Sequence, residues 1–334
     1  MRVALVGCGA VSRNHLTALR DLPDVSVVGL CDLLPDRAEK RRDEFAPDAA
    51  LYSDYVRMLD EIKPDVVHIT TPHYLHCEMA CAALARGINV FLEKPVCMKE
   101  EEIDRLLDAE KASDGKICVC FQNRFNGGTI AARSLVDEHG GAVAARASVT
   151  WKRTAEYYKS SGWRGSKKTE GGGVLINQSI HELDLLIGFL GKPKTVSATV
   201  ANHHLRGVIE VEDTAELLIG FENGSTGFFA ATTAFSLDAP NFLDLYCRDG
   251  RRVTLLGDQL LLDGVTVPYE DRFGAEIAVA PGKQCWGTGH IRLIQLFYEA
   301  LATGSPMPVT VESASDAVRV LLAAYRSKDE TIIL

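Results

Sequence analysis

The chain has 334 residues, 46% hydrophobic and 24% charged, which is an ordinary globular composition and long enough for two domains. Its formal net charge of −9 argues against a nucleic-acid partner or an anionic membrane surface. No stretch approaches the roughly 20 apolar residues of a membrane span, and the short apolar run at the N-terminus predicts a β-strand rather than a signal peptide. We therefore expect a cytoplasmic protein.

The nine cysteines lack the spacing of metal ligands or of a disulfide framework. Cys77 and Cys81 stand one helical turn apart, and Cys118 and Cys120 alternate in a predicted strand. This pattern indicates buried, reduced thiols of a cytosolic protein, and we expect no metal site.

The apolar strand predicted at residues 2–6 runs into Gly7-Cys8-Gly9-Ala10-Val11-Ser12, a G-x-G-x-x pattern with serine at its sixth position. Gly7 would permit a tight turn, and Gly9 would let the backbone approach a pyrophosphate. Residues 10–12 would open a helix whose N-terminus faces the phosphates. A strand, a glycine loop and a helix in this order favour a dinucleotide-binding site.

A second apolar strand, predicted at residues 25–31, ends at Asp32. A carboxylate at that place accepts hydrogen bonds from ribose hydroxyls and repels a 2′-phosphate, which favours NAD over NADP. Arg37 is the feature that would favour NADP, because its side chain could turn toward a phosphate. The alternative for Asp32 is an aspartate that only caps the turn.

Strands and helices continue to alternate through the first half of the chain. The alternation predicts a doubly wound parallel sheet in residues 1–121. Helices are predicted at residues 35–45, 55–62, 79–86 and about 99–113, and strands at 49–52, 66–70, 88–92 and 116–121.

Two polar segments follow buried strands of this predicted sheet, Thr71-Pro72-His73 and Glu93-Lys94-Pro95. Because ligands bind at the carboxyl ends of parallel strands, both segments should share one rim with the glycine loop. Pro95 restricts the backbone of Lys94 and so directs the lysine side chain, and a cis bond before Pro95 would fit this role. The alternative is an ordinary surface turn after a strand.

The second half of the chain, residues 122–334, predicts an α+β domain with a large, mostly antiparallel open sheet. Hairpin turns are predicted at Glu222-Asn223-Gly224 and Arg248-Asp249-Gly250. Residues 266–285 are predicted to form a long loop. Strands are predicted at 142–151, 195–201, 215–221, 225–231, 242–247, 252–256 and 259–262, and helices at 174–190, 290–302 and 313–327.

The predicted helix at residues 174–190 carries Asn177, His181 and Asp184 at i, i+4 and i+7, on a different stripe from its apolar residues. Three polar groups on one face favour a solvated site, and a single hydrogen-bonded core histidine is the alternative. The three glycines at 171–173 would allow the backbone to approach nicotinamide or substrate closely.

Taken together, these motifs resemble the Gfo/Idh/MocA oxidoreductases over nearly the whole chain. The strongest match in the second half is the run from Glu170 to Asp184, with three glycines followed by H-x-x-D. The family usually has an aspartate where Asn177 stands and often a glycine where Ser179 stands. The resemblance implies that Lys94 and His181 form the catalytic pair, with Asn177 beside them.

The resemblance also implies an NAD-dependent enzyme that transfers a hydride between nicotinamide and a secondary alcohol of a sugar, glycoside or cyclitol. His181 is the expected general base, Lys94 would stabilise the alkoxide, and Asn177 would orient a hydroxyl. The expected cofactor contacts are Gly7, Gly9, Ala10, Val11, Asp32, Thr71, Pro72, His73, Glu93 and Lys94. The expected substrate contacts are Lys94, Tyr158, Trp163, Arg164, Asn177, His181 and Asp184. For Asp184 and the aromatic residues, the alternative is a purely structural role.

The family further implies a homodimer or homotetramer that pairs through the open sheet, and C-terminal helices that pack on the first domain. Phe228, Phe229 and Phe235 fit a subunit interface, with core packing as the equal alternative. Two other functions remain open from the sequence. One is a redox-neutral NAD-dependent enzyme that processes glycosides, and the other is a non-catalytic dinucleotide-binding regulator.

Overall fold

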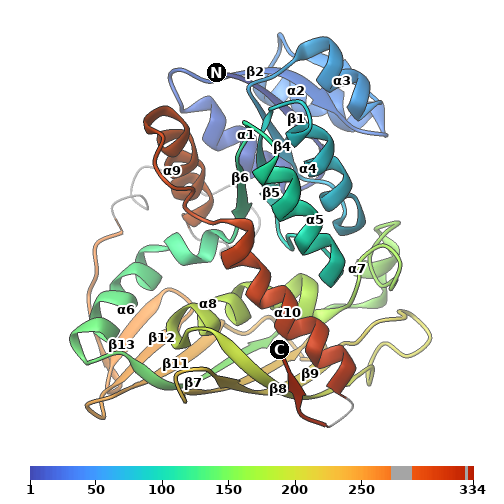
Figure 1. Ribbon diagram of the computed structural model, residues 1–334. Helices are drawn as coiled ribbons and strands as arrows, with labels where there is room; N and C mark the ends of the chain where they lie inside the picture. The colour runs from blue at the N-terminus through green and yellow to red at the C-terminus, as the bar shows by residue number, and fades with distance from the viewer. Residues whose placement is uncertain (272–287, 328–329) are drawn as a thin grey trace. The chain divides into compact units, whose positions relative to one another are not determined.

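The computed structural model describes residues 1–271, 288–327 and 330–334, which form two compact units (Figure 1). The first unit contains residues 1–121 and His290–Ala314. The second contains the described residues from 122 to 289 together with those from 315 to 334. The predicted loop at 266–285 lies largely outside the described residues.

A six-stranded sheet with the order β3-β2-β1-β4-β5-β6 forms the centre of the first unit, and its pairings are parallel. The predicted doubly wound parallel sheet is therefore confirmed. The strand order reverses between β1 and β4, so the loops after these two strands flank the topological switch point, where such folds bind ligands. The strands are β1 (Arg2–Val6), β2 (Ser26–Cys31), β3 (Ala50–Tyr52), β4 (Val66–Ile69), β5 (Asn89–Glu93) and β6 (Ile117–Cys120).

The helices of this unit pack against the sheet through alanine- and leucine-rich faces. Helices α2 and α3 have the predicted bounds, whereas α4 begins three residues earlier than predicted because the buried side chain of His76 takes the place of an apolar residue in its first turn. The helices are α1 (Ser12–Arg20), α2 (Pro35–Phe45), α3 (Tyr55–Ile62), α4 (His76–Leu84), α5 (Glu100–Lys111) and α9 (Gly289–Thr303), with a short 3₁₀ turn η1 (His73–Leu75).

The second unit is built on a sheet with the order β14-β13-β12-β11-β7-β10-β9-β8-β15. Strands β7 and β10 pair in parallel, while the other recorded pairs are antiparallel, which confirms the predicted mostly antiparallel sheet. The strands are β7 (Ala142–Thr150), β8 (Pro193–Ala201), β9 (Thr214–Phe221), β10 (Thr226–Thr232), β11 (Phe242–Cys247), β12 (Arg252–Leu256), β13 (Gln259–Leu262), β14 (Val265–Thr266) and β15 (Ile332–Ile333).

Both predicted hairpins exist, since β9 pairs with β10 and β11 pairs with β12 across the predicted turns. The two-residue strands β14 and β15 were not predicted, because two residues carry no periodic signal. The remaining elements of this unit are η2 (Gln122–Phe125), α6 (Gly127–Glu138), α7 (Ala155–Lys159), η3 (Val174–Gln178), α8 (Ile180–Leu190) and most of α10 (Val311–Ser327).

The predicted continuous helix at 174–190 is wrong in its first part. Residues 174–178 form one π-helical turn, η3, and the α-helix α8 begins only at Ile180. The cause is Glu212, a distant residue whose carboxylate accepts the backbone N–H groups of Gly173 and Leu175 at 2.9 and 3.0 Å. These contacts fix the wider turn, and Ser179 closes it by donating its N–H to the carbonyl oxygen of Val174 at 2.9 Å.

None of the described helices is long and apolar enough to cross a membrane. Of the described cysteines, Cys81 is partly exposed and the others are buried, as expected for thiols in a core.

Candidate functional site

The glycine loop after β1 has two glycines with different structural constraints. Gly7 has a φ of 92°, and a Cβ atom on it would lie 2.6 Å from the carbonyl oxygen of Thr70. A Cβ atom on Gly9 would meet no atom of the chain within 4 Å. Gly7 is therefore required by the fold itself, while Gly9 leaves open the space that a pyrophosphate needs.

Ser12, at the position of the usual third glycine, is hydrogen-bonded to the loop and to Arg41. Its hydroxyl donates to the carbonyl oxygen of Gly9 at 2.6 Å. Arg41 on α2 donates from Nε to the Ser12 hydroxyl at 3.0 Å and from Nη2 to the same Gly9 carbonyl at 3.0 Å. The sequence did not indicate this role for Arg41, because 29 residues separate it from Ser12.

Asp32 lies at the end of β2 against the same loop and is 9% exposed. One carboxylate oxygen accepts the N–H of Cys8 at 2.8 Å, and the other accepts the N–H of Leu34 at 2.9 Å. The aspartate thus caps its own turn and also fixes the glycine loop. Because a carboxylate oxygen accepts more than one hydrogen bond, these contacts leave acceptor capacity for ribose hydroxyls.

The segments after β4 and β5 are tied together by the buried ring of His76. Its Nε2 lies 2.9 Å from the carbonyl oxygen of Thr71, and its Nδ1 lies 2.7 Å from that of Pro95. The Lys94–Pro95 peptide bond is cis, as predicted. The side chains of Thr71, Pro72 and Lys94 are partly buried, that of His73 is buried, Ala10 is exposed and Val11 is partly buried.

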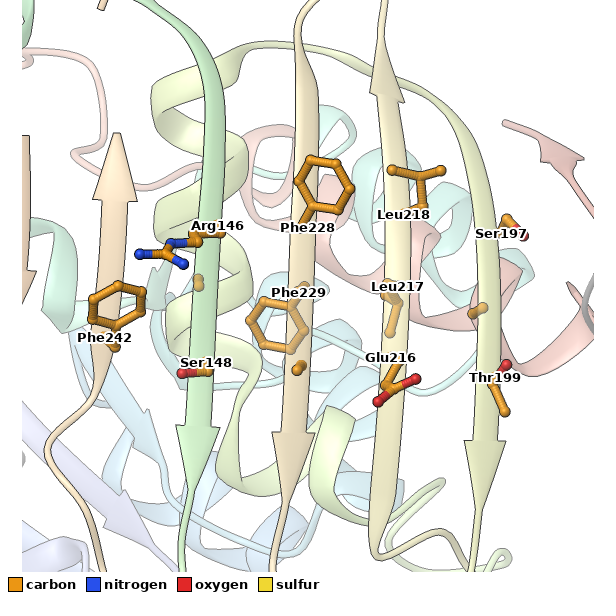
Figure 2. Close-up of a pocket in the computed structure, with 13 residues that line it drawn as sticks. Arg146, Ser148, Ser197, Thr199, Glu216, Leu217, Leu218, Phe228, Phe229 and Phe242 are labelled. Carbon is orange, nitrogen blue, oxygen red and sulfur yellow. The ribbon is translucent and has the colours of Figure 1, made fainter. Parts of the chain in front are cut away.

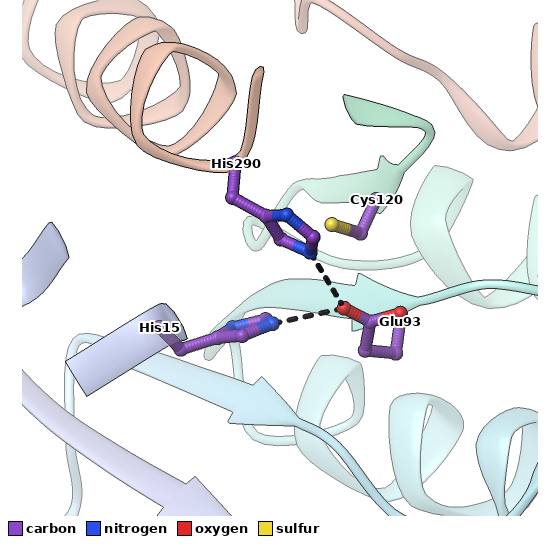
Figure 3. Close-up of side chains that lie close together, drawn as sticks. All are labelled: His15, Glu93, Cys120 and His290. Atoms are coloured by element: carbon purple, nitrogen blue, oxygen red, sulfur yellow. Dashed lines mark hydrogen bonds and ion pairs between the residues drawn. The ribbon is translucent and has the colours of Figure 1, made fainter. Parts of the chain in front are cut away.

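Glu93, directly before Lys94, lies in a cluster of buried polar side chains (Figure 3). Its Oε1 lies 3.0 Å from Nε2 of His15 and 3.6 Å from Nε2 of His290. The ligand-type atoms of His15, Glu93, Cys120 and His290 all lie within 4.8 Å of one another. Burial alone would raise the pKa of Glu93, but its contacts with the two histidines hold that pKa well below its ordinary value.

A chain of hydrogen bonds extends from this carboxylate into the core. His15 Nδ1 lies 2.9 Å from His68 Nδ1, and His68 Nε2 lies 3.0 Å from the hydroxyl of Tyr298. Burial lowers the pKa of both histidines, which keeps them neutral. With neutral rings the donors run in one direction, from Tyr298 through His68 and His15 to the ionised Glu93, which therefore needs no metal ion to satisfy it. The second oxygen of Glu93 accepts the backbone N–H of Lys94 at 3.2 Å, so the network fixes the lysine backbone.

In the second unit, His181 lies in the first turn of α8 and is partly exposed. Its Nε2 lies 3.3 Å from the amide nitrogen of Gln122 on η2. An amide nitrogen only donates, so this contact leaves the lone pair on Nε2 and the proton on Nδ1. In that tautomer Nε2 is the basic nitrogen, and it can act as a general base when a substrate hydroxyl replaces Gln122 as its donor.

Asp184 pairs with Arg124 on η2. Arg124 Nε donates to one carboxylate oxygen at 2.8 Å, and Nη2 donates to the other at 2.5 Å. The buried Asp184 therefore joins η2 to α8, which supports a structural role for this residue rather than a substrate contact.

Asn177 lies in η3 and donates from Nδ2 to Oε1 of Glu170 at 2.5 Å. The other carboxylate oxygen of Glu170 accepts the backbone N–H of Gly165 at 2.5 Å. Glu170 is fully buried, and burial raises its pKa to about 7 although both donors oppose the shift. No local pattern indicates this contact of Glu170, although the residue directly precedes the three glycines.

The predicted aromatic contacts divide into two groups. Tyr158 is 3% exposed and packs in an apolar cluster with Leu205, Ile209 and Val211. The guanidinium carbon of Arg164 lies over the ring of Tyr157 at 4.5 Å, and it lies over the ring of Trp163 at 5.2 Å. Tyr157 also accepts from the amide of Gln178, next to Asn177, at 3.4 Å. Arg164 therefore stacks on Trp163 and Tyr157, and Tyr157 is hydrogen-bonded to η3. Tyr158, in contrast, packs in the apolar cluster.

Comparison with known proteins agrees with this architecture. The profile described as "Oxidoreductase family, NAD-binding Rossmann fold" matches residues 1–121, and that of the "GFO/IDH/MocA C-terminal domain" matches residues 129–253. NAD is therefore the cofactor of the first unit.

Relatives support the assignment along the whole chain. The D-glucoside 3-dehydrogenase of Escherichia coli (strain K12) is 24% identical over 99% of this chain and 96% of its own length. The inositol 2-dehydrogenase of Salmonella typhimurium (strain LT2) is 29% identical over 41% of both chains. The solved structure of levoglucosan dehydrogenase with NADH has a TM-score of 0.88 at 21% identity, covering 100% of this chain and 98% of that one. With both domain profiles matched and the fold shared, the chain belongs to the Gfo/Idh/MocA oxidoreductase family.

Proposed function

We propose that this protein is an NAD-dependent dehydrogenase that transfers a hydride between nicotinamide and a secondary alcohol of a sugar, glycoside or cyclitol. The proposal depends mainly on the position of Lys94. This residue directly follows β5, at the carboxyl end of the parallel sheet, and its backbone N–H donates to the buried carboxylate of Glu93. The names of the relatives, a glucoside dehydrogenase and an inositol dehydrogenase, support the substrate class.

The first unit supplies the groups that hold the cofactor. Gly9 leaves room for the pyrophosphate, the N-terminus of α1 favours its negative charge, and Asp32 accepts from the ribose hydroxyls. Bound NAD supplies the hydride acceptor. Thr71, Pro72 and His73 follow β4 at the switch point, where we expect them to contact the cofactor.

The chain's own side chains handle the proton and the developing charge. We propose that His181 removes the proton of the substrate hydroxyl through Nε2, when that hydroxyl takes the place of the Gln122 amide as donor to the Nε2 lone pair. The ammonium group of Lys94 stabilises the resulting alkoxide, or the carbonyl oxygen in the reverse direction. Asn177 orients a neighbouring hydroxyl without adding charge, and Arg164 and Trp163 offer a donor and a stacking plane for a sugar ring.

The test is a panel of sugars, glycosides and inositols incubated with the purified protein, with NAD and NADP in parallel and NADH formation as the signal. We expect NADH with at least one polyol and a preference for NAD. Tightly held cofactor that does not exchange with added NAD, together with substrate turnover and no net NADH, would replace the proposal with the redox-neutral alternative. NAD binding without turnover of any compound would favour the regulator.

We also propose that the second unit pairs with a second copy of the chain through the exposed face of its sheet. A hollow of about 610 Å³ on this unit is lined by residues of β7, β8, β9, β10 and β11 (Figure 2). Phe228 and Leu218 are 55% and 46% exposed there, whereas Phe229 is buried on the other face. Large exposed apolar side chains on one face mark an interaction surface.

Light scattering after size-exclusion chromatography tests this pairing. Phe228→Glu should shift the protein to a smaller assembly, because the charge would be buried without a partner. Val208→Glu is the matched control, since Val208 is 40% exposed on the same unit but does not line the hollow. A monomeric wild type would refute the pairing.

A further inference from the structure

The side-chain amide of Asn177 donates to a carboxylate seven residues earlier in the chain. Glu170 Oε1 lies 2.5 Å from Asn177 Nδ2, and the glutamate has no exposed surface. The family's usual aspartate at position 177 is replaced, yet a carboxylate is still present one hydrogen bond behind the replacing side chain. This arrangement constrains how Asn177 can face a substrate.

The donors and acceptors around Glu170 explain this constraint on Asn177. An ionised carboxylate only accepts, so both neighbours of Glu170 must present N–H groups to it. Gly165 does so with its backbone N–H on Oε2, and Asn177 must therefore turn its amide nitrogen toward Oε1. The amide oxygen of Asn177 is then directed away from Glu170, and an amide oxygen has two lone pairs with which it can accept.

Resting on the proposed dehydrogenase function, we propose that Glu170 is the positioning residue that makes Asn177 a hydrogen-bond acceptor for a substrate hydroxyl next to the one that is oxidised. Glu170 itself does not touch the substrate. It selects substrates that offer a second hydroxyl as a donor at this place, and that bond orients the ring for oxidation of the hydroxyl that donates to His181. Because burial raises the pKa of Glu170 to about 7, this selection is fully established only above neutral pH. The charged groups that influence Glu170 are Arg164, which favours its ionised form, and Glu212, which opposes it.

The proposal predicts an unusual result for Glu170→Gln. A glutamine has one acceptor end and one donor end, and the fixed N–H of Gly165 takes the acceptor end. The glutamine NH₂ then faces Asn177, which must turn its oxygen inward and present NH₂ to the substrate. At about pH 8.5 we expect kcat/KM for the substrate to fall roughly 10- to 100-fold, with the Kd for NAD unchanged.

A second substitution should restore the function. In Glu170→Gln/Asn177→Asp, the aspartate accepts from the glutamine NH₂ with one oxygen and from the substrate with the other. We expect the double variant to recover most of the lost kcat/KM, although Asn177→Asp alone should be impaired because it opposes two carboxylates. A purely structural Glu170 predicts no recovery, and that outcome would overturn the proposal.

Glu182→Gln is the matched control for removing a buried carboxylate. Burial raises the pKa of Glu182 to about 7, as for Glu170, but one of its oxygens accepts from both Asn123 and Asn241. A glutamine oxygen can accept both bonds, so kcat/KM should change less than about threefold.

A measurement without substrate separates this proposal from the proposed function. In protein labelled with ¹⁵N-asparagine, one side-chain amide proton of Asn177 should be shifted strongly downfield by the carboxylate at pH 8.5. The shift should be lost in Glu170→Gln and kept in Glu182→Gln. If no polyol in the panel is oxidised, the proposed function fails while this signal can persist. If Glu170→Gln leaves the signal unchanged, the positioning role fails independently of any activity.

Discussion

Replacing the two glycines of the nucleotide loop one at a time separates cofactor binding from folding. Gly9→Ala adds a methyl group that meets no atom of the chain within 4 Å, and Gly9 does not have a positive φ. The substitution should therefore leave the free energy of unfolding unchanged or raise it by about 0.4–1 kcal/mol, through the stiffer unfolded chain. The same methyl group would occupy the space where the pyrophosphate approaches the backbone.

The loss of NAD affinity can be estimated from that contact. Forcing one methyl group into a close contact costs about 1–3 kcal/mol, which corresponds to a Kd for NAD roughly 5- to 150-fold higher. Isothermal titration with NAD measures the Kd, and urea unfolding measures stability in the same preparation. A Kd equal to that of the wild type would refute the assignment of this loop as the pyrophosphate site.

Gly7→Ala is the contrasting variant. Its φ of 92° is costly for alanine, and the new Cβ atom would lie 2.6 Å from a backbone oxygen of Thr70. We expect the free energy of unfolding to fall by about 2 kcal/mol or more, because backbone atoms cannot move aside cheaply. Equal stability of the Gly7 and Gly9 variants would show that the loop geometry has been misinterpreted.

Three further predictions address the catalytic and buried groups. Lys94→Ala should lower kcat roughly 100- to 1000-fold with NAD binding intact, and near-wild-type turnover would refute the catalytic role of the lysine. Asn177→Asp should move the histidine limb of the pH–rate profile for alcohol oxidation upward, since a carboxylate favours the imidazolium form of His181. The shift should be clearest when Asn177→Asp is combined with Glu170→Gln, because no second carboxylate then lies beside the new aspartate. An unchanged limb would show that residue 177 and His181 are not coupled. Because the folded pKa of Glu182 is about 7 and its unfolded value is 4.5, the free energy of unfolding falls as pH rises from 4.5 to about 7, by up to about 3 kcal/mol, and levels off above that. Urea unfolding should therefore show Glu182→Gln gaining stability over the wild type between pH 5 and pH 8, and parallel curves would contradict this.

Local patterns in the sequence predicted much of the fold because they reflect local physics. The buried strand β6 is a continuous apolar run and β5 contains one at residues 90–92, as expected for a parallel sheet covered on both faces. The two predicted hairpins depended on Asn-Gly and Asp-Gly pairs, which favour tight turns. The cofactor, NAD, is confirmed by the match to the NAD-binding family profile. The assignment of individual residues to cofactor binding, substrate binding and catalysis stays a prediction, for which the structure gives the local geometry.

The remaining features depend on contacts between residues that are distant in the chain. Glu212 lies 37 residues after Leu175, and no periodic pattern around residues 174–190 announces that its carboxylate will convert the first helical turn into a π-turn. His290 meets Glu93 across nearly two hundred residues. Such contacts decide the orientation of a site although they leave no signal in a local window of sequence.

Three buried glutamates share one physical role in this protein. Glu93 accepts from the Lys94 backbone and from His15, Glu170 accepts from Asn177, and Glu212 accepts from the turn that carries Asn177. A carboxylate buried away from water is tolerated only when donors surround it, so each glutamate imposes donors on its neighbours from more than one side. Glutamine cannot reproduce this where the donors lie on opposite oxygens, because one of its ends is itself a donor. These glutamates therefore orient their neighbours mainly because both carboxylate oxygens accept hydrogen bonds, and less because the carboxylate is charged. In Glu170 this property reaches the proposed substrate site, because the side chain that it orients is the one that replaces the family's usual aspartate.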